Sequence, residues 1–193
     1  MGILDAAIAC ILEHGFERTT MDEIAERADV ARATVFNHFP EKEAVLSAYL
    51  ERRRVLAREL LEREADAGLP AEQRLYDVMD LLAQLNERRV DEARTLVLAW
   101  QRAGSTTRTE PATGQIVGSV IEAGQEAGEL RGDCDPYMVG ALLLDAYVGV
   151  LLRWVGDEGD PEPRFPLREA VREVCRLVIE GLLPAASRAE GEP

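Results

Sequence analysis

The stretch Val-Ala-Arg-Ala-Thr-Val-Phe-Asn-His-Phe, residues 30–39, decides how the first part of this chain folds. After two alanines and an arginine it uses β-branched, aromatic and amide residues, all of which lower helix propensity. Pro40 ends a helix at about Phe39, because the residue before a proline is pushed out of the helical region. The stretch therefore predicts a short helix, beginning near Ala31, whose side chains serve something other than helix stability.

The segment just before it, residues 19–28, is a much better helix former. Thr20 and Glu23 match a capping box, in which the threonine hydroxyl and the glutamate carboxylate each accept from the other residue's amide. This predicts a helix from about 21 to 28, followed by a tight turn in which Asp29 tolerates the left-handed conformation. Two short helices joined by a three-residue turn predict a helix-turn-helix.

The second of these helices has two distinct faces. Ala31, Val35 and Phe39 fall on one side, which we expect to pack against the preceding helices. The outward side carries Arg32, Ala33, Phe36 and Asn37. In a major groove, arginine reads guanine, asparagine reads adenine and an aromatic ring meets the thymine methyl, while a small residue allows close backbone approach. Contact with base edges therefore explains the low helix propensity.

The remaining sequence predicts an all-α protein, because apolar residues recur at helical spacing and no long stretch alternates with period two. The first helix begins at Ile3 and stops at Gly15. The later helices are expected at 41–67, 71–88, 91–102, 112–128, 136–155 and 167–183, with turn-rich loops at 103–114 and 156–166. We expect a DNA-binding domain at 1–45, a ligand-binding and dimerisation domain at 46–184, and a disordered tail at 185–193.

Composition restricts the class of protein. Three cysteines, widely spaced and never in a C-x-x-C pair, indicate neither a disulfide framework nor a zinc site, which fits a reducing cytoplasm. The sequence shows no secretory signal, and we expect no apolar run to reach the length of a membrane span. The net charge of −14, with four basic against nine acidic residues in 1–50, argues against broad affinity for DNA, so any DNA contact must be local.

The segment from Tyr137 to Trp154 is apolar nearly all round, which predicts burial on more than one side. We expect this helix and an apolar stripe of the last helix to form a dimer interface. Each subunit then contributes two helices to it. That stripe comprises Val171, Val174, Cys175, Val178 and Leu182. Gly140 and Gly149 are expected to permit close approach of the helices at this interface.

Asp145 is the one acid within that apolar helix, and a buried carboxylate needs a partner. It could bind a cationic or hydroxylated effector, or an arginine or hydroxyl at the interface. An apolar effector pocket is expected between the fifth and eighth helices, with loop 103–114 over its entrance. Its candidate lining residues are Tyr76, Met79, Trp100, Asp145 and Tyr147. Apolar residues at helical spacing are equally compatible with an ordinary core.

Three motifs together resemble the N-terminal domain of TetR-family transcriptional regulators: Ile-Leu-Asp-Ala-Ala-Ile followed by His-Gly-Phe, then Thr-Thr-Met-Asp-Glu-Ile-Ala, then residues 30–43. The resemblance covers residues 3 to about 50 and implies a homodimer whose N-terminal domains occupy successive major grooves. Carried over by position, base or nearby backbone contacts fall to Arg32, Ala33, Thr34, Phe36 and Asn37. Phosphate contacts fall to Thr19, Thr20, His38 and Lys42.

The sequence departs from that family pattern in three places. Ala31 stands where a serine cap is common, Phe36 stands where tyrosine is common, and no basic arm precedes Ile3. The first departure removes a helix cap worth about 1 kcal/mol, and the second removes a hydroxyl that could reach DNA.

The resemblance implies a sequence-specific DNA-binding regulator, a ligand-responsive repressor acting as a homodimer on a palindromic operator. The alternative is a helical dimer that binds a ligand or a protein and no longer binds DNA. An enzyme is not expected, because His14 and His38 are the only histidines and no nucleophile motif, phosphate loop or metal spacing is present. We likewise expect no cofactor and no metal.

Overall fold

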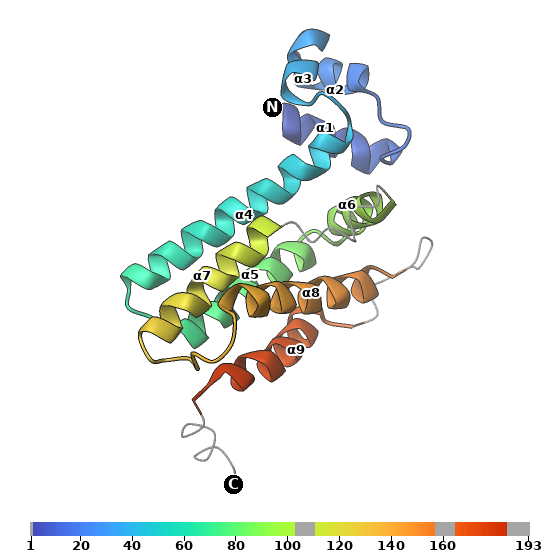
Figure 1. Ribbon diagram of the computed structural model, residues 1–193. Coiled ribbons are helices and arrows are strands. Elements are labelled where there is room, and N and C mark those ends of the chain that lie inside the picture. Colours follow the sequence, from blue (N-terminus) through green and yellow to red (C-terminus); the bar gives the residue numbers. More distant parts are fainter. Residues whose placement is uncertain (1, 103–110, 157–164, 185–193) are drawn as a thin grey trace. The chain divides into compact units, whose positions relative to one another are not determined.

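The computed structural model describes residues 2–102, 111–156 and 165–184, and over these ranges the chain forms helices and no strand (Figure 1). The fold is therefore all-α, as expected from the periodicity. The helices are α1 (Ile3–His14), α2 (Met21–Ala28), α3 (Arg32–His38), α4 (Glu43–Asp66), α5 (Ala71–Glu87), α6 (Val90–Arg102), α7 (Pro111–Glu126), α8 (Pro136–Val155) and α9 (Leu167–Leu182). Most of loops 103–114 and 156–166, and the tail at 185–193, lie outside the described residues.

The described residues divide into two compact units. The first contains residues 2–55 and 88–102, that is, α1 to α3, the beginning of α4, and α6. The second contains the rest of α4 with α5, α7, α8 and α9. Helix α4 is thus shared between the units, and α6 belongs with the N-terminal helices although it lies far from them in sequence.

The local signals in the first unit act as the sequence predicts. The Thr20 hydroxyl accepts from the Glu23 amide at 3.2 Å, and the Glu23 carboxylate accepts from the Thr20 amide at 2.8 Å, so the capping box is confirmed. Asp29 ends α2 in the left-handed conformation, with φ 55° and ψ 50°. Val35 is fully buried in a core with Ile11 and Ile24, and this core holds α3 against α1 and α2.

In the second unit, α8 packs along α7 and α9 packs along α5 and α8. A Cβ atom at Gly140 would lie 2.7 Å from the Gly114 carbonyl oxygen and 2.6 Å from the Gly118 nitrogen. The expected role of Gly140 at a dimer interface is therefore corrected. It permits α8 to approach α7 of the same chain, because no side chain fits between the two backbones.

The outer face of α8 and α9 differs from the expected one. Val171, Cys175 and Leu182 of the predicted stripe are buried inside the unit, so they cannot form an interface with another chain. The most exposed large apolar side chains are instead Met138 and Leu142 on α8, 71% and 54% exposed, and Leu177 on α9, 64% exposed. The sequence showed that α9 is amphipathic, but not which side of its apolar surface the other helices cover.

Helix α8 is long and apolar enough to cross a membrane, contrary to the expectation that no segment would be. Length and composition are the whole of this evidence, and the core helix of a bundle passes the same test. In the described structure Leu143, Tyr147 and Trp154 of α8 are buried. This is the arrangement of a central helix in a packed unit.

Candidate functional site

The exposed face of α3 carries the side chains that the sequence assigned to base contact. Arg32, Ala33, Phe36 and Asn37 are exposed, whereas Val35 and Phe39 on the opposite face are buried. Ala31 was expected to pack with these two but is exposed, because the helix begins one residue later and Ala31 is its N-cap. Anchoring by Val35 and Phe39 leaves the polar face of a short helix available to a ligand.

The beginning of α3 has no side-chain cap, since Ala31 makes no capping hydrogen bond. Its first residue, Arg32, instead forms an ion pair with Asp22 on α2, with 2.9 Å between Nε and Oδ1. The Arg32 guanidinium also lies over the Phe36 ring, 5.3 Å from its centroid. Arg32 is thus held by one residue on each helix of the motif.

The two threonines expected at phosphates differ in accessibility. Thr19 is only 2% exposed and its hydroxyl donates to the Gly15 carbonyl at 2.9 Å, so the expected phosphate contact of this side chain is corrected. Thr20 is exposed, with its hydroxyl in the capping box. Hydrogen bonds from Thr20 lower the pKa of the Glu23 carboxyl, which keeps the cap ionised.

Lys42 and His38 each contact a backbone carbonyl of the same unit. The Lys42 ammonium donates to the Glu17 carbonyl at 3.0 Å and lies 4.6 Å from the centroid of the Phe16 ring. The His38 side chain is exposed, and its Nδ1 donates to the Thr34 carbonyl at 2.9 Å. Because Nδ1 is used in this hydrogen bond, Nε2 is the ring nitrogen that can meet an external group.

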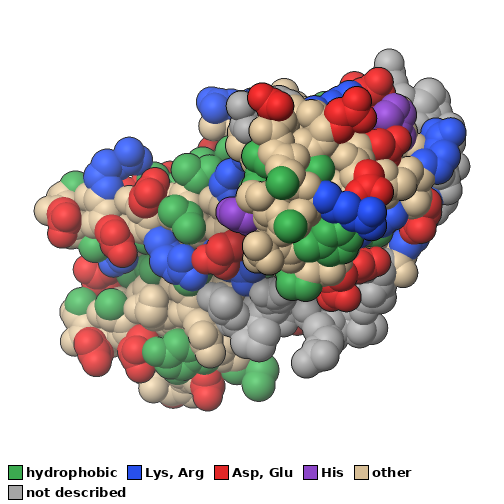
Figure 2. Space-filling model, turned by 90° about the horizontal axis from the view of Figure 1, so that it is seen from above, with side chains coloured by type: hydrophobic (Ala, Val, Ile, Leu, Met, Phe, Trp, Pro, Cys, Tyr) green, Lys and Arg blue, Asp and Glu red, His purple; other side chains and the backbone are tan. Residues whose placement is uncertain are grey.

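Acidic residues accompany the basic ones in this unit. Arg27 is paired with Glu13, and this hydrogen bond lowers the pKa of the Glu13 carboxyl. Figure 2 shows acidic side chains scattered between the basic ones. Among the described residues in view, the basic side chains form no broad area. Weak electrostatic attraction to a phosphate backbone stays the prediction that the charge count makes.

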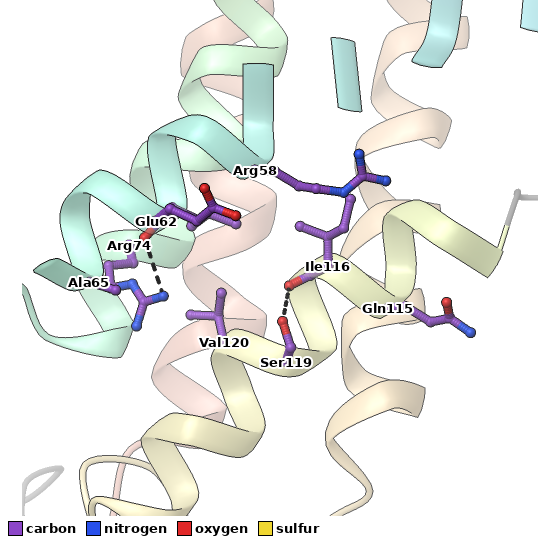
Figure 3. A pocket seen from close by; sticks show the side chains of 9 residues that line it. Arg58, Glu62, Ala65, Arg74, Gln115, Ile116, Ser119 and Val120 are labelled. Carbon is purple, nitrogen blue, oxygen red and sulfur yellow. Dashed lines mark hydrogen bonds between the residues drawn. The ribbon is translucent and has the colours of Figure 1, made fainter. Parts of the chain in front are cut away.

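The second unit contains an open cavity of about 460 Å³ between α4, α5 and α7 (Figure 3). Ile116 and Val120 project into it from α7. The polar groups around it include the guanidinium groups of Arg58 and Arg74 and the carboxylate of Glu62. Its full lining is Arg58, Leu61, Glu62, Ala65, Arg74, Gln115, Ile116, Ser119 and Val120.

Arg74 has an unusual environment at this cavity. Its Nη2 donates to the Leu61 carbonyl at 3.4 Å, while its Nε is buried and has no hydrogen-bond partner among the described residues. A buried donor of this kind is costly unless a further group satisfies it. The spacing of residues 58, 61, 62 and 65 along one helix face was the sequence signal for this cavity, and it was missed.

The five residues predicted to line an effector pocket are absent from the lining of this cavity. Met79 of α5 and Tyr147 of α8 are buried in the core of the second unit, and Tyr76, also on α5, is half-buried. Burial raises the pKa of the Tyr76 hydroxyl. Trp100 packs against the core of the first unit. An ordinary core role accounts for these side chains, and their assignment to an effector pocket stays a prediction.

The prediction that Asp145 is a buried acid inside the apolar helix is wrong. Its side chain is exposed, on the same outer face of α8 as Met138 and Leu142. The polar residue that is buried deeply in this region is Asn86 of α5. It is 1% exposed, and its Nδ2 donates to the Tyr147 hydroxyl at 2.6 Å.

Residues 3–49 match the family model described as bacterial regulatory proteins, tetR family. A helix-turn-helix-type transcriptional regulator of Mycobacterium tuberculosis, Rv1255c, is 30% identical over 200 residues, covering 99% of this chain and 90% of its own. The transcriptional repressor KstR of Mycolicibacterium smegmatis is 29% identical over 155 residues, covering 79% of this chain and 74% of its own. Thermus thermophilus FadR, a TetR-family repressor solved in complex with lauroyl-CoA, superposes with a TM-score of 0.73 at 29% identity, covering 94% of each chain.

Proposed function

This chain belongs to the TetR family of bacterial regulatory proteins and is a DNA-binding transcriptional regulator, and we propose that it is a ligand-responsive repressor. In this proposal a homodimer binds a palindromic operator and an effector in the second unit weakens that binding. The single observation that carries it is the two-sided α3, with Val35 and Phe39 buried and Arg32, Phe36 and Asn37 exposed.

The proposed DNA contacts follow from the chemistry of each exposed side chain. Arg32 reads guanine, Asn37 reads adenine and Phe36 meets a thymine methyl, while Ala33 and Thr34 lie close to bases or to the nearby backbone. Thr20, His38 and Lys42 bind phosphates, which fix the register of the helix in the groove. We assign these contacts to a domain at 1–45, and ligand binding and dimerisation to residues 46–184.

The proposed dimer forms through α8 and α9 against a second copy of the chain. Met138, Leu142 and Leu177 supply large apolar side chains that a monomer leaves in water. Ala170, Val174 and Gly181 extend this face along α9 as small or partly buried residues. Two such helices from each subunit, related by a two-fold axis, form a four-helix interface.

The proposed effector is an amphipathic molecule with an anionic group, bound in the cavity between α4, α5 and α7. Arg58 and Arg74 outnumber Glu62 at its polar side, and the unsatisfied Nε of Arg74 lacks an acceptor that such a group would supply. Leu61, Ile116 and Val120 offer apolar surface to the remainder of the ligand. The lauroyl-CoA complex of the Thermus thermophilus relative supports this chemistry.

Signalling in this proposal passes along α4, which alone among the described helices belongs to both units. An effector that moves α4 changes the spacing of the two α3 helices in a dimer away from one turn of DNA. A coupling of about 1 to 3 kcal/mol would weaken operator binding roughly 5- to 150-fold. We place the protein in the cytoplasm, where its operator lies.

Two observations favour a second candidate, a ligand-binding dimer without DNA affinity. The first 50 residues hold nine acids against four bases, and α3 has no side-chain cap. Both features weaken attachment to a polyanion.

Selection of bound sequences from a random duplex library, with the purified chain at low salt, separates the two candidates. A recovered palindrome with half-sites about one helical turn apart supports the repressor, and an Asn37→Ala variant then loses the adenine preference. Glu59→Gln, an exposed change on α4, serves as the matched control. No enrichment by a folded dimer supports the second candidate.

A further inference from the structure

The ion pair between Asp22 and Arg32 joins the two helices of the helix-turn-helix at its exposed surface. Asp22 lies in the first turn of α2, and Arg32 is the first residue of α3. Their charged atoms, Oδ1 and Nε, are 2.9 Å apart, and both side chains remain mostly exposed, 60% for Asp22 and 66% for Arg32. The pair therefore lies at the surface where the proposed function places DNA, and it contributes little to the core.

A carboxylate at this position needs an explanation, because its negative charge repels DNA. Phosphates repel Asp22, and a charge at the protein surface reduces affinity unless it does something else. Asp22 does not cap α2, since Thr20 and Glu23 complete the capping box between them. Among the described residues its ion pair is with Arg32, which identifies the arginine as the group on which Asp22 acts.

Arg32 is the side chain for which such a contact matters most. An arginine reads guanine with two parallel hydrogen bonds, so the plane of its guanidinium must be oriented correctly. Asp22 contacts the Nε atom, and Phe36 lies under the guanidinium at 5.3 Å. One contact restricts rotation within the plane and the other restricts its tilt. A flexible side chain held in this way loses less conformational freedom when it binds a base.

We propose that Asp22 is a positioning residue for base recognition, which holds Arg32 in the orientation that reads a guanine in each half-site. This inference rests on the proposed function, because it requires that α3 enters a major groove. Asp22 then lowers the general affinity for DNA through its charge and raises the discrimination at one base pair. A purely electrostatic role would change the affinity for all sequences alike.

Binding competition with the selected operator tests this role. Each operator position is replaced by the other bases, and discrimination ratios are measured for the full-length wild type, Asp22→Asn, Arg32→Ala and Glu26→Gln. Glu26→Gln is the matched control, since Glu26 is exposed one turn further along α2 and the substitution also removes one negative charge. Arg32→Ala identifies the base pair that Arg32 reads as the position where its ratio falls. Thermal unfolding checks that each variant is folded.

We expect Asp22→Asn and Glu26→Gln to raise affinity for unrelated DNA to a similar extent. At the position identified by Arg32→Ala, Asp22→Asn should lower discrimination about 5- to 10-fold and leave other positions within about twofold. In the double variant with Arg32→Ala, the Asp22 change should have no further effect there.

Three results would overturn the inference alone while the proposed function stands. They are equal discrimination in Asp22→Asn and Glu26→Gln, a rise of discrimination in Asp22→Asn, and an operator at which Arg32→Ala alters no position. A wild type that selects no sequence at all overturns the inference together with the proposed function.

Discussion

Gly118 on α7 and Gly140 on α8 meet so closely that a Cβ atom on Gly140 would lie 2.6 Å from the Gly118 nitrogen. The contact is between backbones, which cannot swing aside as a flexible side chain can. It explains how α7 and α8, which pack along one another, come together despite the bulk of the residues around them.

Gly140→Ala should therefore destabilise the protein, by about 1 to 3 kcal/mol, although alanine is the better helix former. Urea unfolding at a fixed protein concentration measures the change in the free energy of unfolding. Gly132→Ala is the control, because a Cβ there meets nothing within 4 Å. Equal stability of the two variants would show that the helices separate at little cost.

Tyr147→Phe should lower the free energy of unfolding by about 1 to 2 kcal/mol, because the buried Asn86 amide loses an acceptor at 2.6 Å. The Tyr147 hydroxyl also donates to the Leu82 carbonyl at 3.2 Å, and that bond is lost as well. Tyr137→Phe is the matched control, since its hydroxyl bonds Glu122 at the surface. We expect little change there, and a similar effect of both substitutions would argue against an important buried pair.

Glu64→Gln should stabilise the protein near neutral pH. Glu64 is 8% exposed, and its Oε2 has no hydrogen-bond partner among the described residues. The pKa of its carboxyl is raised, mainly by burial and in smaller part by the negative charge of nearby Asp77. Because the folded pKa exceeds the unfolded one, this group favours folding below the ordinary value of 4.5 and that contribution is lost as the pH rises through the folded pKa.

The measurement for Glu64 is thermal unfolding of wild type and variant across the acidic to neutral range. The advantage of Glu64→Gln should be absent below the unfolded pKa and grow as the pH rises toward neutrality. Glu59→Gln, exposed on the same helix, should follow the wild type throughout. A variant that is less stable than wild type at neutral pH would contradict the reasoning.

Leu177→Glu should convert the proposed dimer to a monomer, because it places a charge on the apolar face of α9, where Leu177 is 64% exposed. Sedimentation equilibrium measures the association, and operator affinity should fall at least about tenfold with it. Leu69→Glu alters another exposed leucine, in the turn between α4 and α5, and should leave the dimer intact. A dimer that survives both Leu177→Glu and Met138→Glu would place the interface elsewhere.

Operator binding should depend only modestly on salt. With about two phosphate-paired cations per subunit, the slope of log K against log salt concentration should be near −3 to −4 for a dimer. Lys42→Gln should reduce its magnitude by about 2, one for each subunit, whereas Arg172→Gln on α9 should not change it. A wild-type slope near −8 would mean that many more basic residues meet phosphates than the proposed interface contains.

Much of the local structure could be predicted from the sequence because its causes are local. The capping box of Thr20 and Glu23 places the beginning of α2. Pro40 places the end of α3, because the preceding residue, Phe39, is extended. Asp29 adopts the left-handed conformation that the turn requires. The exposed face of α3 also followed from periodicity, since a seven-residue helix has room for one buried side, here that of Val35.

The positions that sequence reasoning misplaced all depend on which neighbour covers a surface. Thr19 lies beside an exposed cap, yet its hydroxyl turns inward to Gly15. Asp145 lies within an apolar helix, yet its side chain is exposed in the described part of the chain. The cavity between α4, α5 and α7 arises from residues up to 62 positions apart, from Arg58 to Val120, whose proximity no local pattern encodes.

The sequence by itself determined the helices, their approximate ends and the exposed face of α3, because hydrogen bonds and caps within a few residues decide them. Only the tertiary structure decided which side of α9 is buried, why Gly140 is a glycine, and that Asp22 meets Arg32. A periodic apolar stripe shows that a helix will be covered. Which helix covers it depends on packing between distant segments, where burial and close contact are non-directional and specify a partner only through the shape of the whole unit.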